Sequence, residues 1–311
     1  MSISTAIQRC PRCGNENRSD SYACSFCGKR LRIEQIEKIP LLNRIEEEWT
    51  NPYPIYIKLL YLLINPARAF WDINHLRKKS PGYLILLFNS LVSGLIGWAF
   101  IFHFKFLSIG GVSPAPPLWV FVYKLSFFLA YFLFAFLSQF LFYKFLIWIY
   151  TKGANYSVGF TERIEARFES ASTEASSYKE RELSPFSIYK GGTLLQKQEA
   201  YKSKMMMCAF FPYFIINLIK FFIVLIGFPT IYVDASGPID PLIFTTMVNS
   251  PIWIPLYILD GITLAVWIPI LVTIAIRELS NSSTIRVLIP SYIISILVAV
   301  FFFFIRPVFI P

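Results

Sequence analysis

Charged residues and histidine are scarce in this sequence, and their scarcity excludes several classes of protein. Only 15% of the 311 residues are charged and two are histidine, whereas 55% are hydrophobic and the mean hydropathy is +0.54. Soluble domains carry about 25% charged residues, so a water-soluble enzyme, a disulfide-rich miniprotein and a disordered chain are excluded. The apolar residues lie in runs long enough to cross a bilayer, which predicts an all-α polytopic membrane protein.

Groups that catalyse reactions are equally scarce. The two histidines, His75 and His103, are expected on the surface, and the lone Cys208 is expected to act as a small buried hydrophobe. The sequence has no glycine-rich phosphate loop, no serine or cysteine nucleophile with a motif partner and no pair of intramembrane carboxylates. We therefore expect a protein that is not an enzyme.

Four of the five cysteines form two identical Cys-x-x-Cys-Gly motifs, at Cys10 and Cys13 and at Cys24 and Cys27. Each motif turns two thiolates toward one metal ion, and the glycine permits the backbone to reverse. Four thiolates complete a closed tetrahedral shell around Zn²⁺, which makes the site structural. The alternative is a pair of disulfides, which a reducing cytosol disfavours. We predict a small four-cysteine zinc ribbon over residues 1–32, folded chiefly by its metal.

Basic side chains surround these motifs and would offset the negative charge of a zinc–thiolate centre. They are Arg9, Arg12, Arg18, Lys29, Arg30 and Arg32. Nucleic-acid binding is the weaker alternative, because the aromatic side chains that would stack on bases, Tyr22 and Phe26, are expected to form the small core with Leu31.

Between the ribbon and the membrane, residues 33–54 are polar and predict a helical or flexible tether. The apolar run 55–64 is too short to span a bilayer and is expected at the surface. Asn65 is a good N-cap for a following amphipathic helix, in which Trp71 and the basic cluster Arg77 to Lys79 are typical of the lipid headgroup zone. This pattern predicts an interfacial helix.

Five longer runs predict transmembrane helices. The first contains Ser90, Ser93, Gly94 and Gly97 at overlapping small-xxx-small spacings, which predicts a close-packing face. The predicted spans are residues 82–104, 118–150, 205–229, 251–276 and 287–305.

Positive charge is distributed unevenly along the chain, and its distribution predicts the topology. The net charge is +10, with thirteen Lys and Arg in residues 1–81 and nine in residues 151–204. The loops 108–117 and 230–249 contain none. Because loops on the cytoplasmic side carry an excess of Lys and Arg, we place the N-terminus in the cytoplasm and the C-terminus outside.

The cytoplasmic loop 151–204 is much longer than a helical hairpin requires. Ile164 and Phe168, with flanking Glu and Arg, predict a weak helix, and Ser184-Pro185 and Gly191-Gly192 would end it. Two interpretations stay open: a solvated, partly mobile loop and a docking surface.

Lys220 and Asp260 are the ionisable residues deepest within the predicted spans. Each lies nine residues from the proposed outer end of its helix, so the two side chains are at matched depth on antiparallel neighbours. A lone charge at the bilayer centre costs about 2.5–3.5 kcal/mol, which favours a structural ion pair. The alternative is a proton or ion relay, which needs more polar groups than Asn217, Thr263 and Thr273 provide.

Three short segments share a family pattern. They are Leu63 to Phe70 (LINPARAF), Cys208 to Pro212 (CAFFP) and Val266 to Ile270 (VWIPI), the last followed by IREL and TIR. Over residues 55–306 the chain resembles the Yip domain, the five-span fold of Ypt/Rab-interacting membrane proteins. The resemblance implies work in vesicle traffic or membrane shaping with a small GTPase as partner. The Asp-Leu-Tyr-Gly-Pro motif of eukaryotic members is absent, and the fused ribbon is more like bacterial and archaeal members, which implies a prokaryotic cell membrane.

Taken together, these patterns predict a membrane scaffold or adaptor. The zinc ribbon and the loop 151–204 would recruit a cytosolic or membrane protein, and the helices would anchor it in the lipid bilayer. The alternative is a transporter or channel with a polar path around Lys220 and Asp260.

Overall fold

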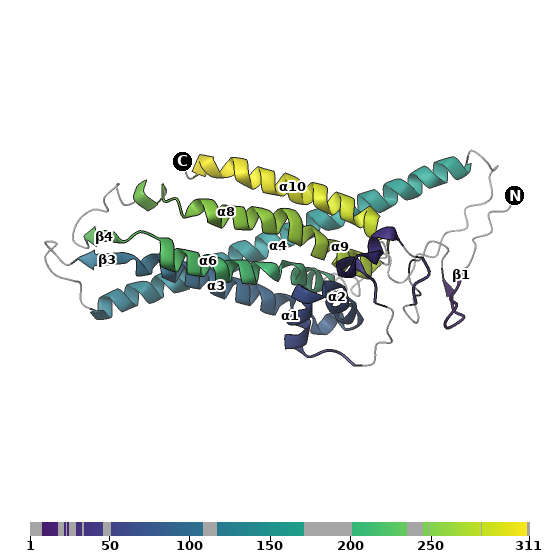
Figure 1. Cartoon of the computed structure of the whole chain (residues 1–311), viewed down its shortest axis with the longest axis horizontal. Coiled ribbons are helices and arrows are strands. Elements are labelled where there is room, and N and C mark those ends of the chain that lie inside the picture. Colours follow the sequence, from purple (N-terminus) through teal and green to yellow (C-terminus); the bar gives the residue numbers. More distant parts are fainter. Residues whose placement is uncertain are drawn as a thin grey trace. The chain divides into compact units, whose positions relative to one another are not determined.

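The computed structural model describes residues 8–17, 22, 24, 29–32, 34–45, 51–107, 117–170, 201–234, 245–247, 249–280 and 282–309, and it is mostly helical (Figure 1). Within these residues five helical segments are long and apolar enough to cross a membrane. They are Gly82–Phe102, Pro117–Ser157, Tyr201–Gly227, Trp253–Ser280 and Thr284–Phe302. The predicted fold class is confirmed to this extent, and the five segments are consistent with an integral multi-pass membrane protein.

The chain before the first span forms short elements. Strands β1 (Gln8–Arg9) and β2 (Glu16–Asn17) pair antiparallel, with Gln8 opposite Asn17. Two 3₁₀ turns follow, η1 (Gln35–Lys38) and η2 (Pro40–Leu42). The described part of the predicted tether is therefore folded, and its contacts are given below.

Helices α1 (Ile55–Ile64) and α2 (Pro66–His75) are joined at Asn65, whose side chain accepts a hydrogen bond from the backbone N–H of Arg68 at 3.3 Å. The predicted N-cap is confirmed. The placement of Trp71 among lipid headgroups was wrong, because this side chain is only 7% exposed and packs inside the protein. The apolar face of α2 is buried against protein, and the basic turn η3 (Arg77–Lys79) follows it.

The apolar helices begin with α3 (Gly82–Phe102) and α4 (Pro117–Ser170). After the 3₁₀ turn η4 (Met207–Phe210) come α6 (Pro212–Gly227), α8 (Trp253–Ile262), the π turn η5 (Thr263–Trp267), α9 (Ile268–Ser280) and α10 (Thr284–Phe309). Strand β3 (Phe104–Leu107) pairs in parallel with β4 (Ile231–Asp234), and the two lie side by side in Figure 1.

Helix α4 is longer than the sequence predicted. The second span was expected to end at Tyr150, but the helix continues through the first twenty residues of the predicted loop 151–204 to Ser170. Ile164 and Phe168 lie in this helical extension, as the sequence predicted. Residues 171–200 lie outside the described part of the chain.

The chain divides into two compact units. The first contains residues 1–82, 146–209 and 269–294, and the second contains residues 83–145, 210–268 and 295–311. In the first unit, the completely buried side chains include Phe70, Ile73, Leu146, Tyr150 and Met205. In the second, α3, α6 and α8 share an apolar core that includes Ala99, Phe100, Val224, Phe228 and Leu256.

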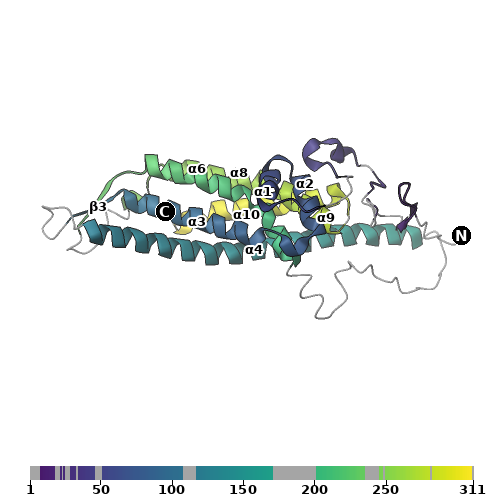
Figure 2. The ribbon, with the colours of Figure 1, turned by 90° about the horizontal axis from the view of Figure 1, so that it is seen from below.

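Small residues bring α3 and α4 close together in the second unit, where the two helices lie side by side (Figure 2). A Cβ atom at Gly97 would lie 2.6 Å from Cγ of Tyr131, and one at Gly94 would lie 3.0 Å from Phe128. A side chain at Gly97 would therefore force Tyr131 to shift and one at Gly94 would fit only tightly, so the predicted close-packing face is confirmed.

Candidate functional sites

The cysteine motifs place three sulfur atoms together. The Sγ atoms of Cys10, Cys13 and Cys24 all lie within 4.8 Å of one another, and those of Cys13 and Cys24 are 3.6 Å apart. In a tetrahedral shell with Zn–S bonds of about 2.3 Å, neighbouring sulfurs are about 3.8 Å apart, so this spacing fits a shared metal ion. The predicted fourth ligand, Cys27, lies outside the described residues.

Backbone hydrogen bonds shape the two cysteine turns in the same way. In the first turn the N–H of Cys10 donates to the carbonyl of Asn15 at 2.9 Å, and in the second the N–H of Cys24 donates to that of Lys29 at 2.8 Å. Both bonds join a cysteine to the residue five positions later. Gly14 has a φ of +72°, a conformation that glycine adopts without steric cost, as the motif predicted.

Asn17 supports the cysteine site, although the sequence analysis did not single it out. Its side-chain Nδ2 donates to Sγ of Cys24 at 3.4 Å and to the carbonyl of Asn15 at 2.9 Å. The side chain is 6% exposed, and Cys10 and Cys24 are 3% and 4% exposed. A buried amide that donates to a thiolate fixes its orientation and stabilises its negative charge. Its place in the sequence, between the two cysteine motifs, was the one signal that could have indicated this role.

Buried charged groups form a second site in the first unit, where residues 34–44 meet the connection between α9 and α10. Arg277 is 0% exposed, and its guanidinium donates to the carbonyl of Leu42 and, at 2.9 Å, to that of Asn43. It also pairs with Glu278, with Nε and Oε1 3.4 Å apart. The predicted tether is therefore attached to the helix connection by a fully buried cation.

Glu37 and Arg44 complete this second site. Arg44 Nε donates to Glu37 Oε1 at 2.6 Å, and the hydroxyl of Thr284 donates to the same oxygen at 2.8 Å. Glu37 is 1% exposed and Arg44 is 6% exposed. The guanidinium of Arg44 also lies 5.5 Å from the ring centroid of Tyr22, close to the cysteine site. Arg44 thus contacts Tyr22 near the cysteine motifs as well as Glu37 within residues 34–44.

Glu34 supplies an N-terminal cap to α10 from a distant part of the sequence. Its Oε2 accepts hydrogen bonds from the backbone N–H groups of Thr284 at 2.9 Å and Ile285 at 3.3 Å. These are the first two residues of α10, whose N–H groups have no partner within the helix. A carboxylate at this end also interacts favourably with the helix dipole.

In the second unit, Lys220 on α6 and Asp260 on α8 are brought together as an ion pair. The Lys220 side chain is 12% exposed and that of Asp260 is 41% exposed. The π turn η5 begins three residues after Asp260, and such turns are frequent at functional sites. Pro269 follows this turn closely, and its missing N–H and bulky ring disfavour a regular α-helical turn before it.

Further polar groups lie in the same unit. Lys220 and the buried Asn217 are on α6, and Tyr213 occupies the same helix face seven residues before Lys220. The ring of Tyr213 lies 6.2 Å from that of Tyr143 on α4, whose hydroxyl accepts a hydrogen bond from Asn89 at 3.0 Å. The polar groups among these apolar helices are therefore more numerous than the sequence predicted.

The remaining candidate residues are the lone cysteine and the two histidines. Cys208 is completely buried, as predicted, with Sγ 3.2 Å from the hydroxyl of Ser80. His75 is exposed, as predicted. His103 was expected at the surface but is half-buried, and its Nε2 lies 3.1 Å from the main-chain oxygens of Val224 and Leu225 near the end of α6. His103 therefore contacts two carbonyls of the last turn of α6, and that of Val224 also accepts a hydrogen bond from the backbone N–H of Phe228 at 3.1 Å.

Comparison with known proteins gives no relative for this chain: no family model, no curated protein and no solved structure matches it.

Proposed function

We propose that this protein is a membrane adaptor, in which a metal-stabilised N-terminal module recruits a cytosolic partner and the apolar helices anchor the module to the membrane. The observation that carries the proposal is the docking of residues 34–44 by Glu37, Arg44 and Arg277. A module on a flexible tether would sample many orientations. A module followed by a docked segment loses little conformational entropy when it binds, which suits a recruitment surface.

Zinc is the metal that we propose for the cysteine site. Thiolate ligands favour zinc, copper(I) and iron–sulfur clusters, and a tetrahedral four-sulfur shell is typical of structural zinc. In this proposal Cys27 completes the shell formed by Cys10, Cys13 and Cys24. The metal would supply folding free energy to the module, and the partner would contact the module's surface rather than the ion.

The membrane arrangement follows from the sequence patterns. We place the N-terminal module in the cytoplasm, on the basis of the Lys and Arg distribution, and the helices in a prokaryotic cell membrane, on the basis of the resemblance to the Yip domain. That resemblance also makes a small GTPase one candidate for the recruited protein.

Affinity purification from membranes followed by mass spectrometry tests the adaptor proposal. The wild type is compared with Cys10→Ser/Cys13→Ser, which we expect to lose zinc and its cytosolic partner while remaining in the membrane fraction. Cys208→Ser is the matched control, because this buried cysteine lies outside the metal site. An unchanged set of partners after loss of zinc would contradict recruitment by the module.

Ion transport is the second candidate function, and the ion pair of Lys220 with Asp260 favours it. Asn217 and Tyr213, together with the hydrogen-bonded pair of Asn89 and Tyr143, extend the polar surface within the second unit. Ion and proton flux in liposomes tests this function. Flux that disappears in Asp260→Asn but persists in Cys10→Ser/Cys13→Ser would favour transport, and no flux from the wild type would contradict it.

A further inference from the structure

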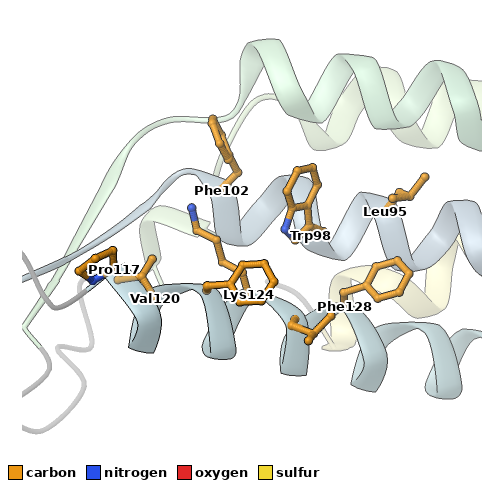
Figure 3. Close-up of a pocket in the computed structure, with 9 residues that line it drawn as sticks. Leu95, Trp98, Phe102, Pro117, Val120, Lys124 and Phe128 are labelled. Atoms are coloured by element: carbon orange, nitrogen blue, oxygen red, sulfur yellow. The ribbon is translucent and has the colours of Figure 1, made fainter.

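A groove of about 610 Å³ lies between α3 and α4 in the second unit (Figure 3). Its walls are almost entirely apolar, with Trp98 and Phe102 on α3 facing Val120, Phe121 and Phe128 on α4. The groove is open at the surface, where Phe102 is 52% exposed and Phe121 is 62% exposed. An apolar groove of this kind, on helices apolar enough to cross a bilayer, fits a hydrocarbon chain.

Lys124 is the single charged residue among those lining the groove. Figure 3 shows its side chain reaching from α4 toward α3, and its Nζ lies 4.8 Å from the ring centroid of Phe102. The side chain is half-buried between more exposed apolar neighbours. No ion pair joins Lys124 to any carboxylate in the described part of the chain. Its positive charge is therefore available to an anion that approaches along the groove.

We propose that this groove binds an anionic phospholipid, with one acyl chain against Trp98, Val120 and Phe128 and the headgroup phosphate beside Lys124. An acyl chain is as apolar as these side chains, so van der Waals packing along the groove holds it in place. A lysine near an anionic headgroup adds about 1 kcal/mol, which converts to about fivefold in affinity. Apolar contacts therefore hold the chain, and Lys124 selects the headgroup. This binding does not depend on the adaptor proposal.

Lys124 also lies near Phe102, the last residue of α3, and a cation at a helix C-terminus is stabilising by itself. That structural role predicts loss of stability without a change in lipid preference, so the two roles are distinguishable. Lys144 offers a matched control on the same helix. Its Nζ lies 5.7 Å from the ring of Phe140, and it does not line the groove.

The test is native mass spectrometry of the delipidated, full-length protein in detergent, titrated with dioleoylphosphatidylglycerol or dioleoylphosphatidylcholine. We expect the wild type to retain the anionic lipid about fivefold better than the zwitterionic one. Lys124→Gln should abolish this preference, and Lys144→Gln should keep it. Val120→Trp, which fills the groove, should reduce retention of both lipids.

Three results would overturn the proposal. The first is equal retention of the two lipids by the wild type. The second is a preference for the anionic lipid that survives in Lys124→Gln. This result would also overturn the proposal if the variant unfolds at a lower temperature, because Lys124 would then be only structural. The third is an equal loss of preference in Lys124→Gln and Lys144→Gln, which would assign the effect to general charge. If Lys124→Gln does not fold, undiminished binding of both lipids to Val120→Trp would overturn the proposal by itself.

Discussion

Lys58 on α1 and Asp72 on α2 form an ion pair in which Nζ and Oδ2 lie 3.0 Å apart, and the two side chains are 3% and 0% exposed. Asp72 also accepts a hydrogen bond from the backbone N–H of Tyr53 at 3.4 Å. The pair joins two ten-residue helices that are too short to cross a membrane. This buried ion pair thus holds α1 and α2 together at one position along each helix.

Removing one member of this pair should destabilise the protein. Asp72→Asn leaves the buried ammonium of Lys58 without its counter-charge, which costs about 3–5 kcal/mol. We expect a clear fall in the temperature of thermal unfolding in detergent. Replacing both members, as Lys58→Met/Asp72→Leu, should recover most of the loss, because an apolar pair needs no desolvation of charge. The exposed Lys79→Met is the control, and an equally large loss in that variant would contradict the assignment.

Asn17→Ala should weaken metal binding without removing a ligand. The substitution deletes the amide that donates to Sγ of Cys24, and loss of such a supporting group lowers metal affinity about 10–100-fold. Competition with a chromophoric zinc chelator measures the change. Asn15→Ala is the matched control, because Asn15 is exposed and contributes its main-chain oxygen to the turn. Equal affinity of the two variants would contradict a role for the Asn17 side chain.

Arg277→Met should release residues 34–44 from the connection between α9 and α10. The carbonyls of Leu42 and Asn43 lose their donor, and the buried Glu37 loses a nearby cation. Breaking a buried charge network of this kind costs about 3–5 kcal/mol. Limited proteolysis should then cut between residues 34 and 54 at protease concentrations that leave the wild type intact. Lys38→Met, an exposed change in the same segment, should leave the cleavage rate unchanged.

Two glycine-to-alanine changes should differ in their effect on stability. Gly97→Ala places a Cβ 2.6 Å from Tyr131 and should destabilise the contact of α3 with α4 by about 1–3 kcal/mol. Gly261→Ala meets nothing within 4 Å and should be neutral or stabilising, because alanine is the better helix former by about 1 kcal/mol. Thermal unfolding of both variants in one detergent measures the difference. Similar melting temperatures would contradict close packing at Gly97.

A charge swap tests whether the pair of Lys220 and Asp260 is structural. Asp260→Asn should lower stability by about 2.5–3.5 kcal/mol, because it leaves the lysine unpaired within the apolar helices. Lys220→Asp/Asp260→Lys should restore much of that loss, since the two charges still meet. A swapped variant that is no more stable than Asp260→Asn would count against a structural pair.

Local patterns were enough to predict much of this fold. The five apolar helices, the N-cap at Asn65 and the glycine of the first cysteine turn each depend on a few neighbouring residues. Sequence spacing also predicted that Lys220 and Asp260 lie at matched positions along neighbouring helices. These features are predictable because length, hydropathy and turn chemistry act over short distances in the chain.

Other features depend on contacts between distant residues and were not predictable in this way. Arg277 donates to the carbonyl of Leu42, which lies 235 positions earlier. Residues 34–44 contain mixed polar and apolar side chains with no regular period, so nothing local separates a docked segment from a flexible one. Trp71 is amphipathic and suits either a headgroup zone or a protein interior, and only its burial decides between them.

The cap that Glu34 gives to α10 also sets an order for assembly. Thr284 is made 250 residues after Glu34, so the first turn of the last helix finds its partner in a segment that left the ribosome long before. Until that helix emerges, the carboxylates of Glu34 and Glu37 have neither the backbone N–H groups nor the hydroxyl of Thr284 to bind. A nascent chain that stops before α10 therefore has the contacts of Arg277 to hold residues 34–44, and completion of the last helix supplies the partners of Glu34.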